Sequence, residues 1–339
     1  MADNKQHNII GITHGDINGI GYEVILKSLC DNKIMDICTP VVYGLAKAAS
    51  FHKKSIDLPD FSFQFVKSTD QLSTRRPNLL NIFDDEVKID LGTSTKVAGQ
   101  MAERALYIAG KDLKNKHIDA IVTAPINKDN IQSEKFTFPG QTEFFEHYFG
   151  GNNHKALMMM VSDNIRIGFV TNHLPIQKVS AAITKELVYQ KLEILHNTLK
   201  QDFALDNPTI AVLSLNPHAG DNGLIGQEEK EVLRPTIELA FQNHINAFGP
   251  FPSDGFFATA AYRKFDAVLA MYHDQGMIPF KFLAADGVNY TAGLPIVRTS
   301  PAHGTAYDIA GKNKANSQSM RNAIYLAVDI LKNRRRNQQ

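Results

Sequence analysis

Three apolar stretches of this chain each end on a histidine: IGFVTNH (167–173), IAVLSLNPH (210–218) and AVLAMYH (267–273). In an open α/β sheet, ligands bind in the crevice beyond the carboxyl ends of the strands. Three imidazoles carried to that edge suit a divalent metal ion that keeps one coordination position open. The metal ligands predicted on this basis are His173, His218 and His273.

Strand-like and helix-like segments alternate along almost the whole chain. Residues 8–13 (NIIGIT) and 118–124 (IDAIVTA) have the pattern of buried strands, and 93–109 has helical spacing behind Ser/Thr capping residues. Alternating β and α segments with continuous apolar strands predict a largely parallel sheet between two layers of helices, an α/β/α sandwich. The expected domains are 1–130 together with 290–339, and 131–289.

Composition narrows the class of protein. Of 339 residues, 43% are hydrophobic, and 36 basic against 35 acidic residues leave a net charge of +1, which predicts neither a nucleic-acid nor a membrane partner. Two cysteines make no disulfide framework, and no signal peptide or membrane span is evident. We therefore expect a soluble cytoplasmic protein. The basic run at 332–336 is interpreted as a solvated helix end, with a binding patch as the alternative.

Two further motifs lie beside apolar strands. GDINGIG (15–21) follows the first strand and is either a tight turn or an anion-binding loop, because its spacing fits neither a Rossmann nor a P-loop motif. HDQG (273–276) places Asp274 where it can orient an imidazole. Asp254 is an alternative partner, or simply the N-cap of the helix that follows.

Basic and amide side chains follow the third histidine. Lys281, Asn289 and Arg298 are suited to clamp a phosphate or carboxylate, although each alone is typical of a protein surface.

Six blocks of sequence carry a resemblance to a known family. They are THGDINGIG (13–21), VTAPINK (122–128), FPGQTE (138–143), SLNPHAGDNGLIGQEE (214–229), MYHDQG (271–276) and LPIVRTSPAHGTAYDIAGK (294–312). In order and over nearly the whole chain, they resemble the 4-hydroxythreonine-4-phosphate dehydrogenase family of pyridoxal phosphate biosynthesis.

The resemblance implies a fold of the isocitrate/isopropylmalate dehydrogenase type and a homodimer with a shared active site. It also implies NAD or NADP and one divalent ion (zinc, cobalt or magnesium), held by the same three histidines from both subunits. Implied substrate contacts are Gln141, Thr142, Lys281, Asn289 and Arg298, and the implied cofactor contacts are His303, Gly304, Thr305 and Asp308. The catalytic candidates are Asp254, Asp274 and Lys281.

The chain departs from the family pattern at several places, one of which is a slightly shorter segment between Lys281 and Asn289. Gln141 stands where the family has histidine, and an amide forms hydrogen bonds but cannot ionise. We therefore predict that Gln141 binds substrate without transferring a proton. Ile17 and Asn18 replace Pro-Ala, and Tyr22 replaces a proline, which leads us to expect a looser loop.

The activity implied is oxidation of 4-phosphooxy-L-threonine (4-hydroxythreonine 4-phosphate) to a 3-oxo acid, which decarboxylates to 3-amino-2-oxopropyl phosphate. The alternatives are a sister dehydrogenase acting on a threonate or erythronate phosphate, an acyl-phosphate transferase, and a non-catalytic metabolite-binding protein. Gln141 favours the first of these alternatives, whereas the three histidines argue against the second.

Overall fold

The computed structural model describes residues 7–83, 87–151 and 154–337. The chain divides into two compact units. The first unit comprises Met1–Asn152 and Pro295–Lys332, and the second comprises Asn153–Leu294 and Asn333–Gln339.

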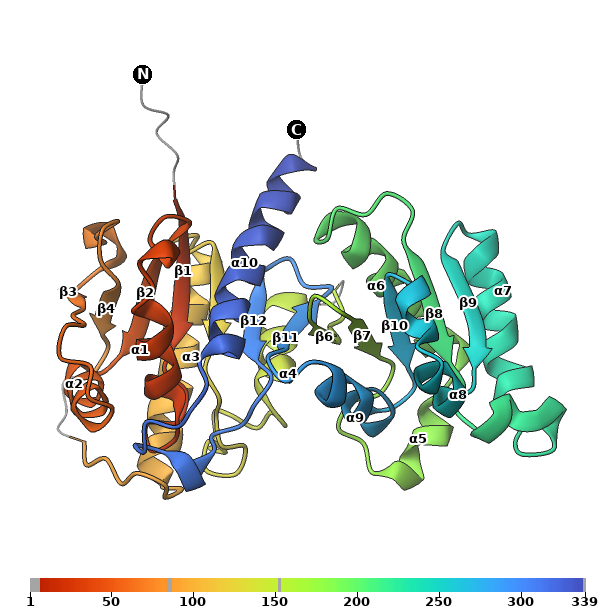
Figure 1. Ribbon diagram of the computed structural model, residues 1–339, viewed down its shortest axis with the longest axis horizontal. Coiled ribbons are helices and arrows are strands. Elements are labelled where there is room, and N and C mark those ends of the chain that lie inside the picture. The colour runs from red at the N-terminus through yellow and green to blue at the C-terminus, as the bar shows by residue number, and fades with distance from the viewer. Residues whose placement is uncertain (1–6, 84–86, 152–153, 338–339) are drawn as a thin grey trace. The chain divides into compact units, whose positions relative to one another are not determined.

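The sheet of the first unit is parallel throughout its described strands. Its order is β3-β4-β2-β1-β5-β12 (Figure 1), with β1 paired to β2 and β5. The strands are β1 (Asn8–Thr13), β2 (Cys38–Gly44), β3 (Gln64–Val66), β4 (Asn78–Asn81), β5 (Ala120–Thr123) and β12 (Arg298–Pro301). The continuous apolar runs are central strands because both faces of the sheet are covered.

Helices cover this sheet in Figure 1, with α1 and α10 in front of it and α3 behind. The helices are α1 (Gly21–Leu29), α2 (Ala46–Ser55), α3 (Lys96–Lys114), α4 (Gln141–Phe145) and α10 (Gln318–Arg336), the last of which ends in the second unit. The Thr95 side chain caps α3 by accepting a hydrogen bond from the Ala98 amide. The capped helix predicted at 93–109 therefore exists, displaced toward the C-terminus.

An aromatic cluster holds residues beyond 130 to the first unit. The ring of Phe144 lies 5.0 Å from Tyr107 of α3, 5.5 Å from Phe136 and 5.6 Å from Tyr148, measured between centroids. Phe136 and Phe144 are buried. The sequence suggested a boundary at 130/131, whereas this packing keeps the segment with α3.

The second unit has a mixed sheet in the order β11-β6-β7-β10-β8-β9. Parallel pairing joins β7, β10, β8 and β9 in turn, whereas β6 is antiparallel to both β7 and β11. The strands are β6 (Leu157–Val161), β7 (Arg166–Phe169), β8 (Thr209–Leu213), β9 (Asn246–Phe251), β10 (Ala267–Ala270) and β11 (Val288–Ala292). The three strands that precede the candidate histidines are thus neighbours with a common direction.

The helices of the second unit are α5 (Ile176–Ala182), α6 (Lys185–Gln201), α7 (Arg234–Gln242), α8 (Ser253–Ala258) and α9 (His273–Leu283). Helix α9 approaches β7 closely at Gly276, where a Cβ atom would lie 2.6 Å from the ring of Phe169. This glycine of the HDQG motif lets the first turn of α9 lie directly on the strand.

Arg334, in the C-terminal basic run, has a structural partner. Its Nε donates to Oδ1 of Asp202 at 2.6 Å, and its Nη2 donates to Oδ2 at 3.2 Å. Asp202 is only 2% exposed and also accepts a hydrogen bond from Tyr290. The sequence suggested that this basic run is a solvated helix end or a binding patch. Arg334 fits neither interpretation, because it is paired with the buried Asp202.

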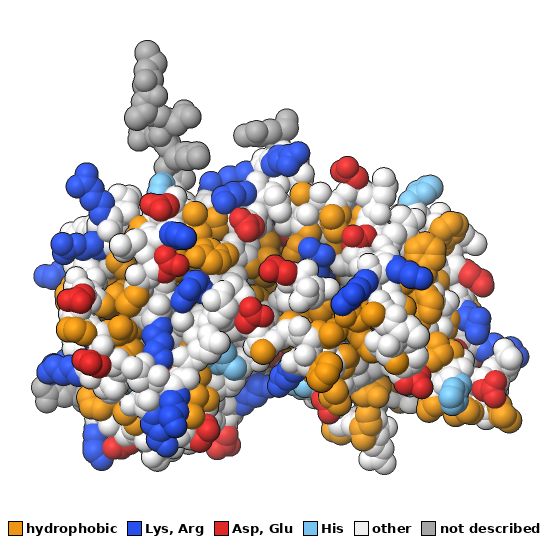
Figure 2. Space-filling model, in the orientation of Figure 1, with side chains coloured by type: hydrophobic (Ala, Val, Ile, Leu, Met, Phe, Trp, Pro, Cys, Tyr) orange, Lys and Arg blue, Asp and Glu red, His pale blue; other side chains and the backbone are white. Residues whose placement is uncertain are grey.

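Both units alternate strands and helices, so the predicted α/β class with a largely parallel sheet is confirmed. Figure 2 shows basic and acidic side chains spread over the visible face, in agreement with the small net charge. Within the described residues, no helix combines the length and apolarity needed to cross a membrane.

Candidate active site

Two of the three predicted metal ligands lie side by side in the second unit. His173 follows β7, His273 is the first residue of α9, and their ring centroids are 5.7 Å apart. Nδ1 of His273 lies 2.6 Å from Oδ1 of Asp274. This contact fixes one ring nitrogen of His273 and leaves Nε2 for a ligand; the orienting role of Asp274 stays a prediction.

The third predicted ligand, His218, is exposed in a turn after β8. Within the described chain, no three His, Cys, Asp or Glu side chains are grouped closely enough to hold a metal ion. A single chain therefore brings together His173 and His273 but does not add His218 to them.

The turn that carries His218 has an unusual backbone. Five consecutive residues, 218–222, have φ between 41° and 75°, and only one of them is glycine. Left-handed backbone costs roughly 1–2 kcal/mol for each non-glycine residue, so the turn must be held by its surroundings. Strain of this kind is concentrated at functional sites.

Glu229 is one of the groups that hold this turn. Its buried carboxylate accepts hydrogen bonds from the amides of Leu215 (2.8 Å) and Asn216 (2.7 Å), and from the Asn216 side chain at 2.9 Å. These bonds give the second glutamate of the 214–229 block a structural function that the sequence analysis did not assign.

The other predicted residues of the second unit lie on three different elements. Asp254 is exposed in the first turn of α8, whose N-cap is Pro252, so the N-cap interpretation of Asp254 was wrong. Lys281 is exposed in the last turn of α9, and Asn289 is half-buried in β11.

A cluster of polar side chains lies in the first unit around the guanidinium of Arg298, which is 3% exposed. Its guanidinium donates to Thr123 Oγ1 at 2.7 and 3.1 Å, to Thr142 Oγ1 at 3.4 Å and to Gln141 Oε1 at 3.2 Å. Burial lowers the pKa of Arg298 to about 10, against the opposing effect of Glu143, so the group remains charged near neutral pH. Three of the residues predicted to bind substrate, Gln141, Thr142 and Arg298, are thus joined by hydrogen bonds from the guanidinium.

Gln141 is itself held at both ends of its amide. Nε2 donates to the carbonyl of Ala124 at 3.1 Å while Oε1 accepts from Arg298, and the residue is 8% exposed. This pair of bonds fixes the orientation of the amide and, through it, of the guanidinium.

The predicted cofactor segment, which contains His303, Gly304, Thr305 and Asp308, is attached to the first loop. The Ile20 amide donates to the Thr305 carbonyl at 3.0 Å, and the Tyr307 hydroxyl donates to Asp16 Oδ2 at 2.7 Å. Asn130 also donates to that buried oxygen, at 2.8 Å. Asp16, Asn130 and Tyr307 were not singled out from the sequence, although two of them lie inside the quoted blocks.

The first loop is tightly bound rather than loose, so that expectation was wrong. The Asn18 side chain donates to the carbonyl of Thr93 at 2.9 Å and to Thr95 Oγ1 at 3.0 Å, and it accepts from the Asp90 amide at 2.9 Å. The hydroxyl of Tyr22 accepts from the Leu45 amide at 2.8 Å. Side-chain hydrogen bonds therefore replace the rigidity that prolines would supply.

Behind this loop is a buried stack of rings. His14 stacks on Tyr22 with centroids 5.4 Å apart, and Tyr22 stacks on His52 at 5.1 Å. All three are fully buried, and burial lowers the pKa of His14 to about 4.

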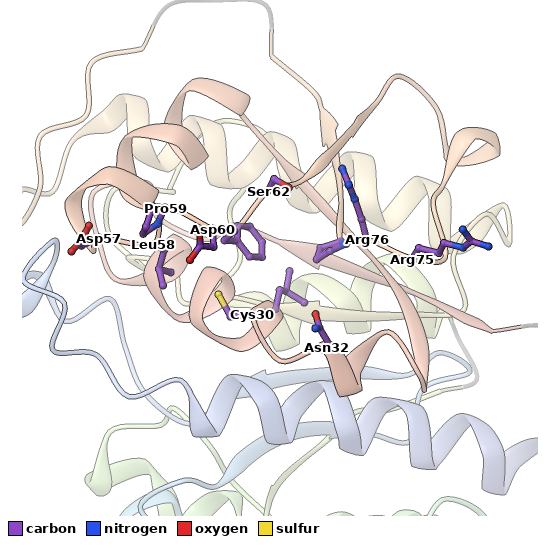
Figure 3. A pocket seen from close by; sticks show the side chains of 12 residues that line it. Cys30, Asn32, Asp57, Leu58, Pro59, Asp60, Ser62, Arg75 and Arg76 are labelled. Atoms are coloured by element: carbon purple, nitrogen blue, oxygen red, sulfur yellow. The ribbon is translucent and has the colours of Figure 1, made fainter.

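The first unit also contains a cavity of about 630 Å³ (Figure 3). Its lining carries charges of both signs, from Asp57, Asp60, Arg75 and Arg76. None of the predicted site residues lines it, so it is a separate feature from the candidate site.

Comparison with known proteins assigns the family. Residues 36–327 match the model of the family described as pyridoxal phosphate biosynthetic protein PdxA. A 4-hydroxythreonine-4-phosphate dehydrogenase of Bacteroides thetaiotaomicron is 50% identical over 99% of this chain and 92% of its own. An Oceanobacillus iheyensis protein, provisionally named D-threonate 4-phosphate dehydrogenase, is 38% identical over 95% of this chain and 97% of its own.

A solved structure agrees with these matches. The crystal structure of 4-hydroxythreonine-4-phosphate dehydrogenase from Klebsiella pneumoniae superposes with a TM-score of 0.81 at 31% identity, over 97% of this chain and 99% of that one. With a family model covering most of its length and a relative that is half identical, this chain belongs to the PdxA family of pyridoxal phosphate biosynthetic proteins.

Proposed function

We propose that this chain oxidises the C3 hydroxyl of 4-phosphooxy-L-threonine, with NAD or NADP as hydride acceptor. The 3-oxo acid then loses CO2 to leave 3-amino-2-oxopropyl phosphate. The relative that is 50% identical over 99% of this chain carries this proposal. The cytoplasm is the proposed location, because neither Cys30 nor Cys38 is in a disulfide.

His173 and His273 are the proposed metal-binding pair. Their rings adjoin, and Asp274 orients His273, so the donor set fits a divalent ion such as zinc, cobalt or magnesium. When bound, such an ion lowers the pKa of the substrate hydroxyl and polarises the neighbouring oxygens. Asp254 and Lys281 are proposed as further catalytic residues.

The third ligand, His218, is proposed to come from a second copy of this chain. One chain pairs His173 with His273 and leaves His218 apart from them. Hydrophobic side chains are also exposed on α5, on α9 and directly after His173, where a second copy would cover them (Figure 2). These side chains are Leu174, Ile176, Ile278 and Phe282.

A mixing experiment tests the shared site. His218→Ala and His273→Ala homodimers should both be inactive, whereas exchange of their subunits should form one intact site in each hybrid dimer and restore part of the activity. His173→Ala mixed with His273→Ala is the control and should restore nothing, since both histidines come from one chain. No activity from either mixture, with exchange verified by mass spectrometry, would reject the shared site. Activity from the control mixture alone would overturn the assignment of His173 and His273 to one chain.

Arg298 and Thr142 are the proposed anchors for an anionic end of the substrate, with Lys281 and Asn289 as further contacts. The buried guanidinium stays charged beside Glu143 and donates to the neutral side chains of Thr123 and Thr142, and a buried cation of this kind favours an anionic ligand. Residues 303–308 are proposed to bind the nicotinamide cofactor, with Asp308 accepting hydrogen bonds from ribose hydroxyls.

D-threonate 4-phosphate is the second candidate substrate. The provisionally named relative at 38% identity and the glutamine at position 141 favour it. It ranks second because the relative at 50% identity is named 4-hydroxythreonine-4-phosphate dehydrogenase.

The deciding assay measures NADH or NADPH formation with each of the two substrates. Enzyme treated with a chelator should lose activity and regain it with zinc, cobalt or magnesium. Turnover of 4-phosphooxy-L-threonine with a higher kcat/KM supports the proposal. A preference for D-threonate 4-phosphate, or full activity without metal, would refute it.

A further inference from the structure

The side chain of Gln275 joins three separate segments of the second unit. Its Oε1 accepts a hydrogen bond from the Met271 amide at 2.6 Å. Its Nε2 donates to the carbonyl of Ser214 at 2.5 Å and to Oγ of Ser253 at 2.8 Å. One amide therefore ties the first turn of α9 to the end of β8 and to the start of α8.

Each of these segments leads into the candidate site. Met271 comes just before His273, Ser214 just before the turn that carries His218, and Ser253 immediately before Asp254. The contacts of Gln275 thus fix the ends of two neighbouring parallel strands, β10 and β8, at the places where the chain leaves the sheet.

An amide is the side chain that suits this position. It presents an acceptor and two donors at once, which matches one amide N–H, one carbonyl and one hydroxyl. A glutamate of the same length could accept from Met271 but would place a carboxylate oxygen against the carbonyl of Ser214. The bonds of Gln275 therefore depend on its chemistry as well as on its size.

The His218 turn needs such a support. Its five left-handed residues begin four positions after Ser214, and Glu229 holds the intervening Leu215 and Asn216. Gln275 holds the preceding residue and links it to the strand that ends at His273.

We propose that Gln275 is a positioning residue for metal binding, which fixes the segment that carries His273 and the segment that carries His218, each of which serves one of the two shared sites of a dimer. The inference rests on the proposed metal site. Gln275 touches neither the metal nor the substrate in this role, because it acts through the backbone of the ligand-bearing segments. Loss of such a supporting contact typically weakens metal affinity about ten- to a hundredfold.

The test is a titration of metal-free dimeric enzyme with Co²⁺, followed by visible absorption, for Gln275→Ala and Gln275→Glu. The control variant is Gln242→Ala, at the exposed end of α7. We expect the Co²⁺ dissociation constant to rise about ten- to a hundredfold in both Gln275 variants, with an altered absorption spectrum. The control should match the wild type.

The outcomes separate this inference from the metal site itself. Wild-type affinity and spectrum in a folded Gln275 variant would overturn the positioning function while leaving the metal site intact. If the wild type fails to bind Co²⁺, both proposals fail. Thermal unfolding without metal, run in parallel, identifies a variant that binds poorly only because it is unfolded. If Gln275→Ala does not fold, the Co²⁺ titration of Gln275→Glu decides the outcome, because this variant keeps the side-chain volume and the contact with Met271.

Discussion

Replacing Gln141 with glutamate should weaken substrate binding without unfolding the protein. The amide oxygen of Gln141 lies 3.2 Å from Nη2 of the buried Arg298. A carboxylate there attracts the guanidinium by about 4 kcal/mol at 4 Å, for an effective dielectric constant of about 20. Desolvation of the carboxylate, together with repulsion between its second oxygen and the carbonyl of Ala124, costs several kcal/mol, so the opposing terms nearly cancel in the free energy of unfolding.

Substrate affinity should change much more than stability. A second carboxylate beside Arg298, in addition to that of Glu143, further weakens the attraction of the guanidinium for the substrate anion. A charge-assisted hydrogen bond contributes about 1.5–3 kcal/mol. The KM for 4-phosphooxy-L-threonine should therefore rise roughly ten- to a hundredfold in Gln141→Glu. The KM for NAD or NADP should stay the same, because the predicted cofactor residues are not in this cluster.

Steady-state kinetics with each substrate varied in turn, together with urea unfolding, would measure these effects. Gln141→His, the residue usual in the family, serves as the control that keeps a hydrogen-bonding side chain without a permanent negative charge. An unchanged KM for the phosphorylated substrate in folded Gln141→Glu would refute the argument. So would an equal rise in both KM values, because that result indicates a general disturbance.

Three stability predictions follow from buried polar groups. The pKa of His14 is about 4 in the folded protein and 6.5 unfolded, so full stability is present above pH 6.5 and up to about 3 kcal/mol is lost as the pH falls toward 4. His14→Phe should remove that part of the pH dependence in urea unfolding, and an unchanged slope would contradict it. Glu229→Gln should lower the free energy of unfolding by about 2–3 kcal/mol, because an amide accepts more weakly than a carboxylate and turns a donor toward Asn216. A loss below about 0.5 kcal/mol would argue against the function of Glu229 in holding the turn. Arg334→Ala should cost about 3 kcal/mol by leaving Asp202 buried without its cation, measured by the same unfolding assay, and a neutral substitution would show that the pair is not needed.

The strands and their direction could be predicted from the sequence because their signals are local. Apolar runs such as 210–215 and 267–271 are too short for helices and too hydrophobic for loops, and alternation with helical segments makes parallel pairing the expected arrangement. The same reasoning placed three histidines at strand ends. It could not say which two would meet, since that depends on the path of the chain after each strand.

The arrangement of the candidate site and of the first loop was decided by the tertiary structure, through contacts between residues far apart in sequence. His218 lies in the left-handed turn and does not join the His173–His273 pair of its own chain, and the turn is held by Glu229 and by Gln275. The first loop, where this chain lacks prolines that the family has, is held in place because Asn18 and Tyr22 form hydrogen bonds to partners between 23 and 77 residues away. A hydrogen bond depends on where two groups lie in space, whereas hydrophobic periodicity depends only on neighbours along the chain. The sequence alone therefore determined the class of fold and the candidate ligands, and only the packed chain determined which of those ligands lie together.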